Sequence, residues 1–170
     1  MFGEQEERAA AEAIRSGWVS QGSKVAEFER ALADYCGTGE AVAVSNCTSA
    51  LHLALRVLGV GPGDEVITPS LTWVSTVNLI SLMGATPVFI DVDRHTLMTD
   101  AAMIEEAITP RTRAIIPVHF AGAPLDLDPI RAIAAARIMS SLMWAWPLRH
   151  NTQIAPSRRI ARCSVASRRS

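Results

Sequence analysis

A segment of small polar residues at 45–49 (SNCTS) follows the apolar run at 41–44 and opens a helical pattern. The backbone N–H groups at the start of a helix, together with the hydroxyls of Thr48 and Ser49, can bind a phosphate. The segment has neither the glycine spacing of a dinucleotide-binding motif nor that of a P-loop, which argues against both ligands. A simpler role, in which Ser45 or Thr48 only caps the helix, stays open on this pattern.

Two other side chains with useful chemistry follow apolar runs. Trp73 lies in a segment at 68–75 (TPSLTWVS), and its indole could stack on a heteroaromatic ring or pack into the core. His119 follows the run at 114–118, where a lone histidine is more often a hydrogen-bonded structural residue than a catalyst. Both remain candidates for a site.

The elements that must position these residues alternate along the chain. We predict helices at 4–16 and 24–35, with Gly37 ending the second. Strand-like apolar runs and helical patterns then follow in turn: strands at 41–44, 66–68, 87–91 and 114–118, and helices from 48 to about 58, at 72–83, at 100–107 and from about 128. Either Thr99 or Asp100 can cap the helix at 100–107.

Four short strands separated by helices predict an α/β fold, with a mostly parallel sheet covered on both faces. Ligands of such sheets bind at the carboxyl ends of the strands. The polar segments at 45–48, 69–73 and 119–124 all fall at such ends. Any function should therefore be sought there.

The composition is that of a soluble globular protein, with 170 residues, 49% of them hydrophobic and 19% charged. The sequence has no run of 18 apolar residues and no pattern of a signal peptide at its start, so we expect a cytoplasmic protein. Three cysteines without a Cys-x-x-Cys spacing favour reduced thiols over a disulfide framework or a zinc site. No metal site is expected.

Charge divides the chain sharply. All 17 acidic residues and nine basic ones lie in 1–136, whereas 137–170 holds seven arginines and no acid. Interleaved Arg and Trp could bind nucleic acid, but this tail has no repeat and no amphipathic period. Because the composition changes inside an expected helix, we favour the interpretation that 137–170 comes from a shifted reading frame or is disordered.

Several segments of the chain resemble, in order and spacing, the DegT/DnrJ-type sugar aminotransferases, which are fold-type I pyridoxal-phosphate enzymes. The segments are SGWVSQG at 16–22, AVSNCTSALH at 43–52, GDEVITPS at 63–70, GATPV at 84–88, ITPRT at 108–112 and IPVH at 116–119. The resemblance covers about residues 3–136. Within the family, the stretch at 63–93 is most similar to members that aminate UDP-4-keto-arabinose for lipid A modification.

The resemblance implies a role for each candidate residue. Thr48 and Ser49 would hold the phosphate of pyridoxal 5'-phosphate, and Trp73 would stack on its pyridine ring. The reaction would move an amino group, in most cases from glutamate, to a keto group of a nucleotide-linked sugar. The intact enzyme would be a homodimer, with neither nucleic acid nor membrane as a partner.

The sequence also departs from the family. Transamination needs a lysine that forms a Schiff base with the cofactor, and the one lysine here is Lys24, outside the family's catalytic segment. An Asp-x-Ala-[His/Gln] motif is expected near 144, where the chain reads WAW at 144–146. We therefore expect 1–136 to be a partial large domain, truncated and inactive, followed by the unrelated tail. The alternative is a non-catalytic binding or interaction module with a phosphate-binding loop and a basic tail.

Overall fold

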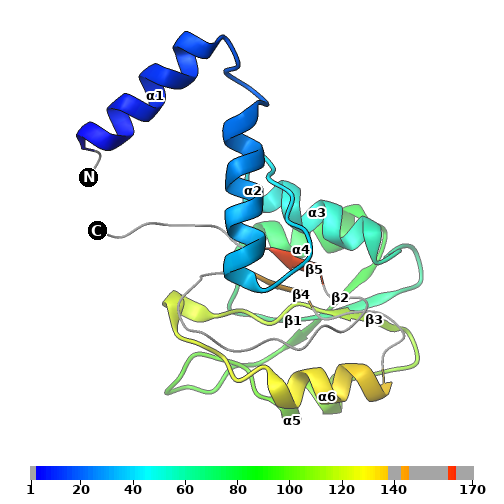
Figure 1. The fold of residues 1–170 in the computed structure, drawn as a ribbon. Helices are drawn as coiled ribbons and strands as arrows, with labels where there is room; N and C mark the ends of the chain where they lie inside the picture. Colours follow the sequence, from blue (N-terminus) through cyan, green and yellow to red (C-terminus); the bar gives the residue numbers. More distant parts are fainter. Residues whose placement is uncertain (1–2, 138–142, 146–160, 164–170) are drawn as a thin grey trace. The chain divides into compact units, whose positions relative to one another are not determined.

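The computed structural model describes residues 3–137, 143–145 and 161–163, and the chain divides into two units. Among the described residues the first unit runs to Val44. It holds two helices, drawn in blue in Figure 1: α1 (Glu4–Ser16) and α2 (Ser23–Cys36). Each helix ends at a glycine in the left-handed region, Gly17 at φ 76° and Gly37 at φ 62°, where a side chain would be strained. Both helices, and the role of Gly37, were predicted.

The predicted strand at 41–44 is wrong. This run is not a strand in the structure, Val42 is 76% exposed, and the backbone N–H of Ala43 donates to Glu29 Oε1 at 2.8 Å. A strand forms only where a neighbouring strand accepts and donates its backbone hydrogen bonds. Within the described residues no strand pairs with this run. The apolar pattern alone could not reveal that.

The second unit, from Ser45, is built on a three-stranded parallel sheet with the order β2-β1-β3. The strands are β1 (Glu65–Pro69), β2 (Thr86–Ile90) and β3 (Thr112–Ile115). Figure 1 shows helices on both sides of this sheet. One pair is α3 (Cys47–Val57) with α4 (Val74–Leu82), and the other is α5 (Ala101–Ala107) with α6 (Asp128–Arg137). The predicted α/β class, with a parallel sheet covered on both faces, is confirmed.

Local sequence patterns fix where these elements begin and end. Asp100 caps α5 by accepting a hydrogen bond from the N–H of Met103 at 2.8 Å, which decides between the two predicted caps. The turn before β1 is closed by a bond from Asp64 N to Gly61 O at 3.1 Å. A short 3-10 turn, η1 (Phe120–Gly122), follows β3.

The core has two layers because neighbouring side chains on a strand point to opposite faces. Val66 and Ala114, which are paired in register, pack with Leu55 and Ile80 beneath α3 and α4. The next pair in register, Ile67 and Ile115, is equally buried and by alternation faces α5 and α6. These two helices supply the buried Ile104 and Ile130 to the same layer. Each such side chain stabilises the fold by about 1.5–3 kcal/mol relative to full exposure.

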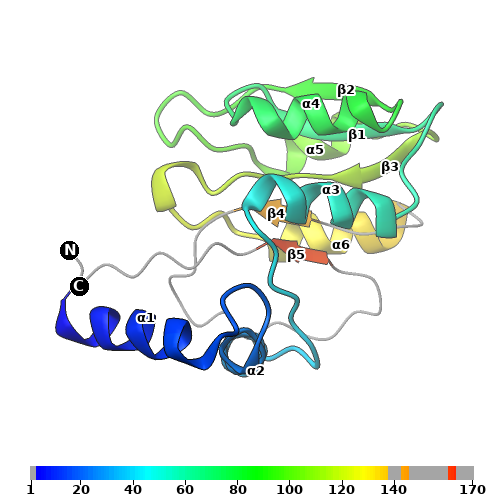
Figure 2. The same ribbon diagram turned by 90° about the horizontal axis from the view of Figure 1, so that it is seen from above.

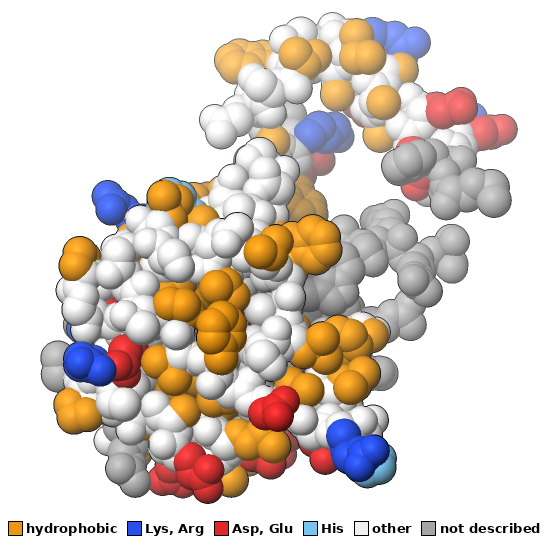
Figure 3. Space-filling view, turned by 180° about the vertical axis from the view of Figure 1, so that it is seen from behind, with side chains coloured by type: hydrophobic (Ala, Val, Ile, Leu, Met, Phe, Trp, Pro, Cys, Tyr) orange, Lys and Arg blue, Asp and Glu red, His pale blue; other side chains and the backbone are white. Residues whose placement is uncertain are grey.

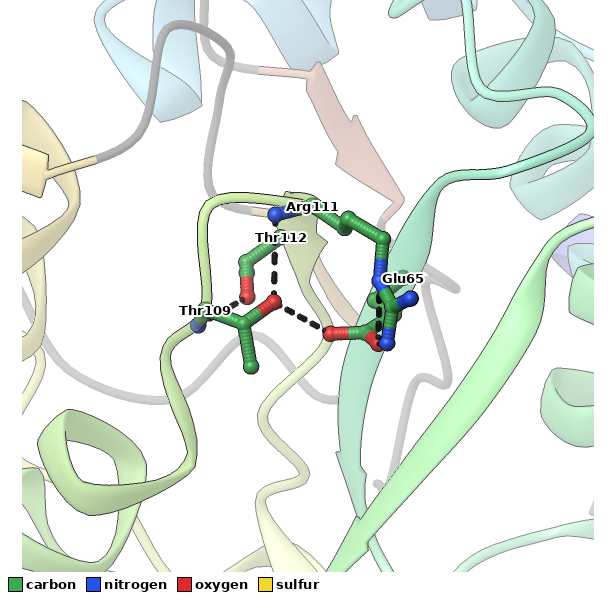
Figure 4. A network of polar contacts seen from close by, with 4 residues as sticks. All are labelled: Glu65, Thr109, Arg111 and Thr112. Carbon is green, nitrogen blue, oxygen red and sulfur yellow. Dashed lines mark hydrogen bonds and ion pairs between the residues drawn. The ribbon is translucent and has the colours of Figure 1, made fainter.

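A polar network joins the starts of β1 and β3 at the amino edge of the sheet (Figure 4). Glu65, the first residue of β1, is only 6% exposed. Its carboxylate accepts hydrogen bonds from the Thr109 hydroxyl and from the Arg111 guanidinium, whose Nε lies 2.9 Å from Oε1. Thr112 Oγ1 accepts from the N–H of Thr109 at 2.9 Å. The Thr109 hydroxyl, assisted by Arg111, holds the pKa of Glu65 below its usual value although burial opposes this.

The same edge also holds the far end of α3. Arg113 of β3 reaches across with its Nε 3.1 Å from the carbonyl oxygen of Leu58, the residue that caps α3. A cation at the C-terminus of a helix interacts favourably with the helix dipole. Side-chain hydrogen bonds thus connect the start of β3 both to the start of β1 and to the end of α3.

The region predicted to be an unrelated tail contributes two short strands to the described residues. They are β4 (Met143–Ala145) and β5 (Ala161–Cys163), which pair in parallel. Most of the segment at 137–170 lies outside the described residues, so the predicted origin and disorder of this tail stay predictions.

Apolar side chains also reach the surface. Figure 3 shows them from behind, in separate groups among charged residues. The large ones in the second unit are Leu53, Val57, Trp73, Val74, Leu82, Phe89 and Leu97. None of the helices described here has the length and apolar character needed to cross a bilayer.

Candidate functional site

The N-termini of α3 and α4 lie at the carboxyl edge of the sheet, opposite the Glu65 network. The turn after α3 leads directly into the amino end of β1, and α3 has 11 residues, a length of about 16 Å. A strand of five residues spans about the same distance, so the first turn of α3 reaches the other edge. Helix α4 begins just after β1 ends, and Figure 2 shows both helices running along the strands.

Asn46 is the N-cap of α3, so the alternative left open by the sequence, in which Ser45 or Thr48 only caps the helix, is wrong. The Oδ1 atom of Asn46 accepts a hydrogen bond from the N–H of Ser49 at 2.9 Å. The Ser45 and Ser49 hydroxyl oxygens lie 3.3 Å apart, and Thr48 is exposed. Asparagine caps well because its short side chain reaches the N–H groups of the first turn. The hydroxyls of Thr48 and Ser49, which are predicted to bind phosphate, therefore lie in the first turn of α3, and neither of them caps the helix.

Trp73 is the N-cap residue of α4 and makes no side-chain capping bond. Its side chain is 77% exposed, which excludes the alternative of packing into the core. An indole this exposed leaves a large flat apolar surface in water, and such surfaces often bind ligands. Trp73 thus has the exposure that a stacking residue needs, at the same edge as Thr48 and Ser49.

His119 follows β3 at this edge and is half-buried. Its Nδ1 accepts a hydrogen bond from the N–H of Leu125 at 2.9 Å. Burial lowers the pKa of His119 below its usual value of 6.5, which favours the neutral ring. The structure thus places His119 in a structural hydrogen bond.

The carboxyl edge fits part of a phosphorylated heteroaromatic cofactor. A helix N-terminus with two hydroxyls suits the phosphate, and the exposed indole suits the ring. For a covalent attachment the sequence offers only Lys24, whose Nζ pairs with Glu27 Oε2 at 3.2 Å within α2. That hydrogen bond raises the pKa of Lys24, which keeps it protonated and a poor nucleophile. In the described ranges no group of His, Cys, Asp and Glu could hold a metal ion.

The parallel sheet and its two helical layers are the fold of the pyridoxal-phosphate aminotransferases, whose solved structures match this chain. A family model described as the DegT/DnrJ/EryC1/StrS aminotransferase family matches residues 1–140. The chain belongs to this family. Pyridoxal phosphate is the family's cofactor, as solved forms with PLP and with PMP illustrate.

Individual relatives agree with this assignment. The chain is 59% identical over 127 residues to a UDP-4-amino-4-deoxy-L-arabinose–oxoglutarate aminotransferase of Shewanella sediminis, covering 75% of this chain and 33% of that protein. The crystal structure of 3-amino-5-hydroxybenzoic acid synthase matches with a TM-score of 0.79 and 39% identity, over 85% of this chain and 38% of that one. A protein of Streptococcus pneumoniae described as a sugar aminotransferase, in its PLP form, matches with a TM-score of 0.78 and 35% identity, over 85% and 40%. The chain spans about a third of the curated relative's length and about two fifths of the solved structures.

Proposed function

We propose that this chain is the phosphate-binding part of an aminotransferase that moves an amino group from glutamate to a keto group of a nucleotide-linked sugar. The arrangement at the carboxyl edge carries the proposal, because the first turn of α3 and the exposed Trp73 at the start of α4 both lie there. The family and the 59% identity to a UDP-sugar aminotransferase support the substrate class. We further propose a cytoplasmic location, and a homodimer as the state of the intact enzyme.

Each residue of the edge has one task in this proposal. Thr48 and Ser49 donate hydrogen bonds to phosphate oxygens, which the N–H groups of the first turn of α3 and its dipole also attract. Trp73 covers one face of the pyridine ring and excludes water from it. When bound, the cofactor supplies an electron sink for the carbanion chemistry of amino-group transfer. The residues of this chain hold and orient it.

We propose that the chain as printed does not catalyse transamination. The reaction needs a lysine that attaches the cofactor and moves a proton, and the sequence contains only Lys24. That side chain is engaged with Glu27 in a helix of the other unit. We expect no turnover above that of free cofactor when the chain is mixed with pyridoxal phosphate, glutamate and UDP-4-keto-arabinose. Turnover that disappears in Lys24→Ala would contradict this.

A binding titration tests the phosphate-binding role. We expect pyridoxal phosphate to bind with a Kd of about 1 mM or weaker, close to −4 kcal/mol, because no lysine attaches it. The double variant Thr48→Ala, Ser49→Ala should weaken binding by about tenfold or more, since it removes two hydrogen bonds to a charged group. Ser81→Ala is the matched control, because this exposed serine lies at the opposite end of α4. Equal affinity of the double variant and the wild type would refute the assigned roles.

We also propose that the segment from Arg137 derives from a shifted reading frame. The matched family residues end at 140, and the acidic residues stop at Asp128. Sequencing the gene around codon 137 should show that another frame encodes an apolar strand, an Asp-x-Ala-[His/Gln] motif and a later lysine. A verified read with no such motif in either alternative frame would refute this origin and make the basic tail a feature to explain.

A further inference from the structure

We propose that His119 is a positioning residue, whose neutral imidazole fastens the loop at 119–125 against the carboxyl edge of the sheet. The inference rests on the proposed function, in which this edge receives the cofactor. The loop begins where β3 ends, and parallel strands present their ligand-binding loops at that end. In this assignment His119 touches neither cofactor nor substrate, and acts through the shape of the loop that it closes.

Two hydrogen bonds close the loop. Leu125 donates its backbone N–H to His119 Nδ1 at 2.9 Å, and Ala123 donates its N–H to Phe120 O at 2.9 Å. The second bond closes only the tight turn η1. The first joins residues six apart, and so it sets the span of the whole loop.

The loop that this hydrogen bond closes contains a residue with a strained backbone, Ala121. Ala121 has φ 50° and ψ 22°, which lies in the left-handed region. An L-residue with a Cβ pays about 1–2 kcal/mol for that conformation. Strained backbone persists only where the surroundings hold it, and it is often found next to binding sites. The hydrogen bond between His119 and Leu125 closes the loop around Ala121.

The fastening depends on the protonation state of the ring. A neutral histidine has one nitrogen that donates and one that accepts, and since Nδ1 accepts here, the proton is on Nε2. A protonated ring would present an N–H from Nδ1 to the N–H of Leu125, and the bond would be lost. Burial lowers the pKa of His119, so the accepting form is kept to a lower pH than for an exposed histidine.

Neighbouring charges are engaged elsewhere. Asp126 accepts from the N–H of Asp128 at 3.2 Å, and Asp128 pairs with Arg131 Nη1 at 3.0 Å. At the carboxyl end of β2, Asp93 accepts from the N–H groups of its own turn, and Asp91 is exposed. Burial, rather than any of these charges, is the cause of the lowered pKa of His119.

The sign of the pH effect follows from the lowered pKa. The fold favours neutral His119, so its contribution to stability is complete above the usual value of 6.5. That contribution is lost as the pH falls from 6.5 through the lowered pKa of the folded state. The loop should therefore loosen as the pH falls through this lowered pKa, while the rest of the sheet stays folded.

Amide hydrogen exchange in the full 170-residue chain tests the fastening. We expect the protection factor of the Leu125 amide to fall by about tenfold or more as the pH is lowered from about 8 through the lowered pKa of His119. In His119→Asn the side-chain oxygen replaces Nδ1 as acceptor and cannot titrate, so protection should persist over this pH range. In His119→Ala protection should be low throughout it. Protection in His119→Ala equal to that of the wild type would overturn the inference.

A second readout links the loop to the cofactor site. Pyridoxal phosphate should shift the amide resonances of Thr48 and Ser49, with an affinity that His119→Ala lowers severalfold and His119→Asn preserves. Unchanged affinity in His119→Ala would overturn the positioning role. If the wild type shows no shift at either residue, the proposed function fails instead, and the Leu125 protection factors still decide whether His119 fastens the loop.

Discussion

The two edges of the parallel sheet are built in opposite ways. At the amino edge Glu65 is buried, its carboxylate is fully hydrogen-bonded, and Arg111 and Arg113 tie separate elements together. At the carboxyl edge Thr48 and Trp73 are exposed. Polar groups that are satisfied internally stabilise a fold, whereas polar and aromatic groups left in water can bind a ligand. The difference separates the part of the unit that maintains the sheet from the part proposed to hold a cofactor.

The separation predicts that the two edges respond differently to substitution. Changes at the amino edge should lower the free energy of unfolding and leave cofactor affinity unchanged. Changes of Thr48, Ser49 or Trp73 at the carboxyl edge should leave the free energy of unfolding nearly unchanged and weaken the binding of the cofactor.

Glu65→Ala should have the largest effect on stability. It leaves the Thr109 hydroxyl and the Arg111 guanidinium without their shared acceptor, and we expect a loss of about 2 kcal/mol, moderated by the exposure of Arg111. Urea unfolding measures this, and the affinity for pyridoxal phosphate should not change. Glu106→Ala, an exposed carboxylate on α5, is the control and should stay within about 0.5 kcal/mol. A similar small change in both variants would remove the contrast between the edges.

The pH dependence of stability should show the same carboxylate. The pKa of Glu65 is lowered in the fold, so its contribution is present above the usual value of 4.5 and is lost as the pH falls through the lowered pKa. The loss should be smaller than that of Glu65→Ala, because the protonated side chain keeps an acceptor oxygen. Unfolding free energies of the wild type and of Glu65→Gln, measured from neutral pH downward, should converge in this acidic range. Parallel curves would show that Glu65 does not titrate differently in the folded state.

Ala121→Gly should stabilise the protein modestly. Glycine adopts the left-handed conformation of residue 121 without the Cβ penalty of about 1–2 kcal/mol, offset by its greater freedom in the unfolded chain, about 0.4–1 kcal/mol. A net gain of about 0.5–1 kcal/mol should raise the urea midpoint. Ala123, two residues further in the same loop, has φ −70°, and Ala123→Gly should destabilise. Equal signs for the two variants would show that residue 121 is not strained.

Trp73→Ala should have the smallest effect on stability and a clear effect on binding. Because the side chain is 77% exposed, its removal should change the free energy of unfolding by less than about 0.5 kcal/mol. Loss of stacking should weaken pyridoxal phosphate by about two- to tenfold. A large loss of stability would mean that Trp73 belongs to the core of the folded unit.

The sequence predicted best those elements whose causes are local. Gly37 ends α2 as expected, Asp100 caps α5, and the apolar runs at 66–68 and 87–91 became β1 and β2. Each of these features depends on residues close together in the chain, so a pattern can reveal it. The prediction of a strand at 41–44 was wrong because a strand also needs a partner strand. Whether such a partner lies beside a segment is not specified by the residues near it in the chain.

For the candidate site, residue types were predictable and contacts were not. The polar segment at 45–49 and Trp73 were identified from the sequence, and their exposure agrees with a binding role that remains to be tested. Asn46 was missed as the cap although asparagine is among the preferred residues there, because serine and threonine stood beside it. No sequence pattern marked the strained Ala121 or the bond between His119 and Leu125, since both arise only when the loop closes.

The order of the strands has a consequence for how the protein is made. Strand β1 lies between β2 and β3, and both partners follow it along the chain. Every member of the hydrophobic core cluster lies between Leu51 and Ile116. Domains fold as units while the ribosome is still adding residues. All the side chains of this core cluster are therefore synthesised before the ribosome reads the codons that follow residue 137.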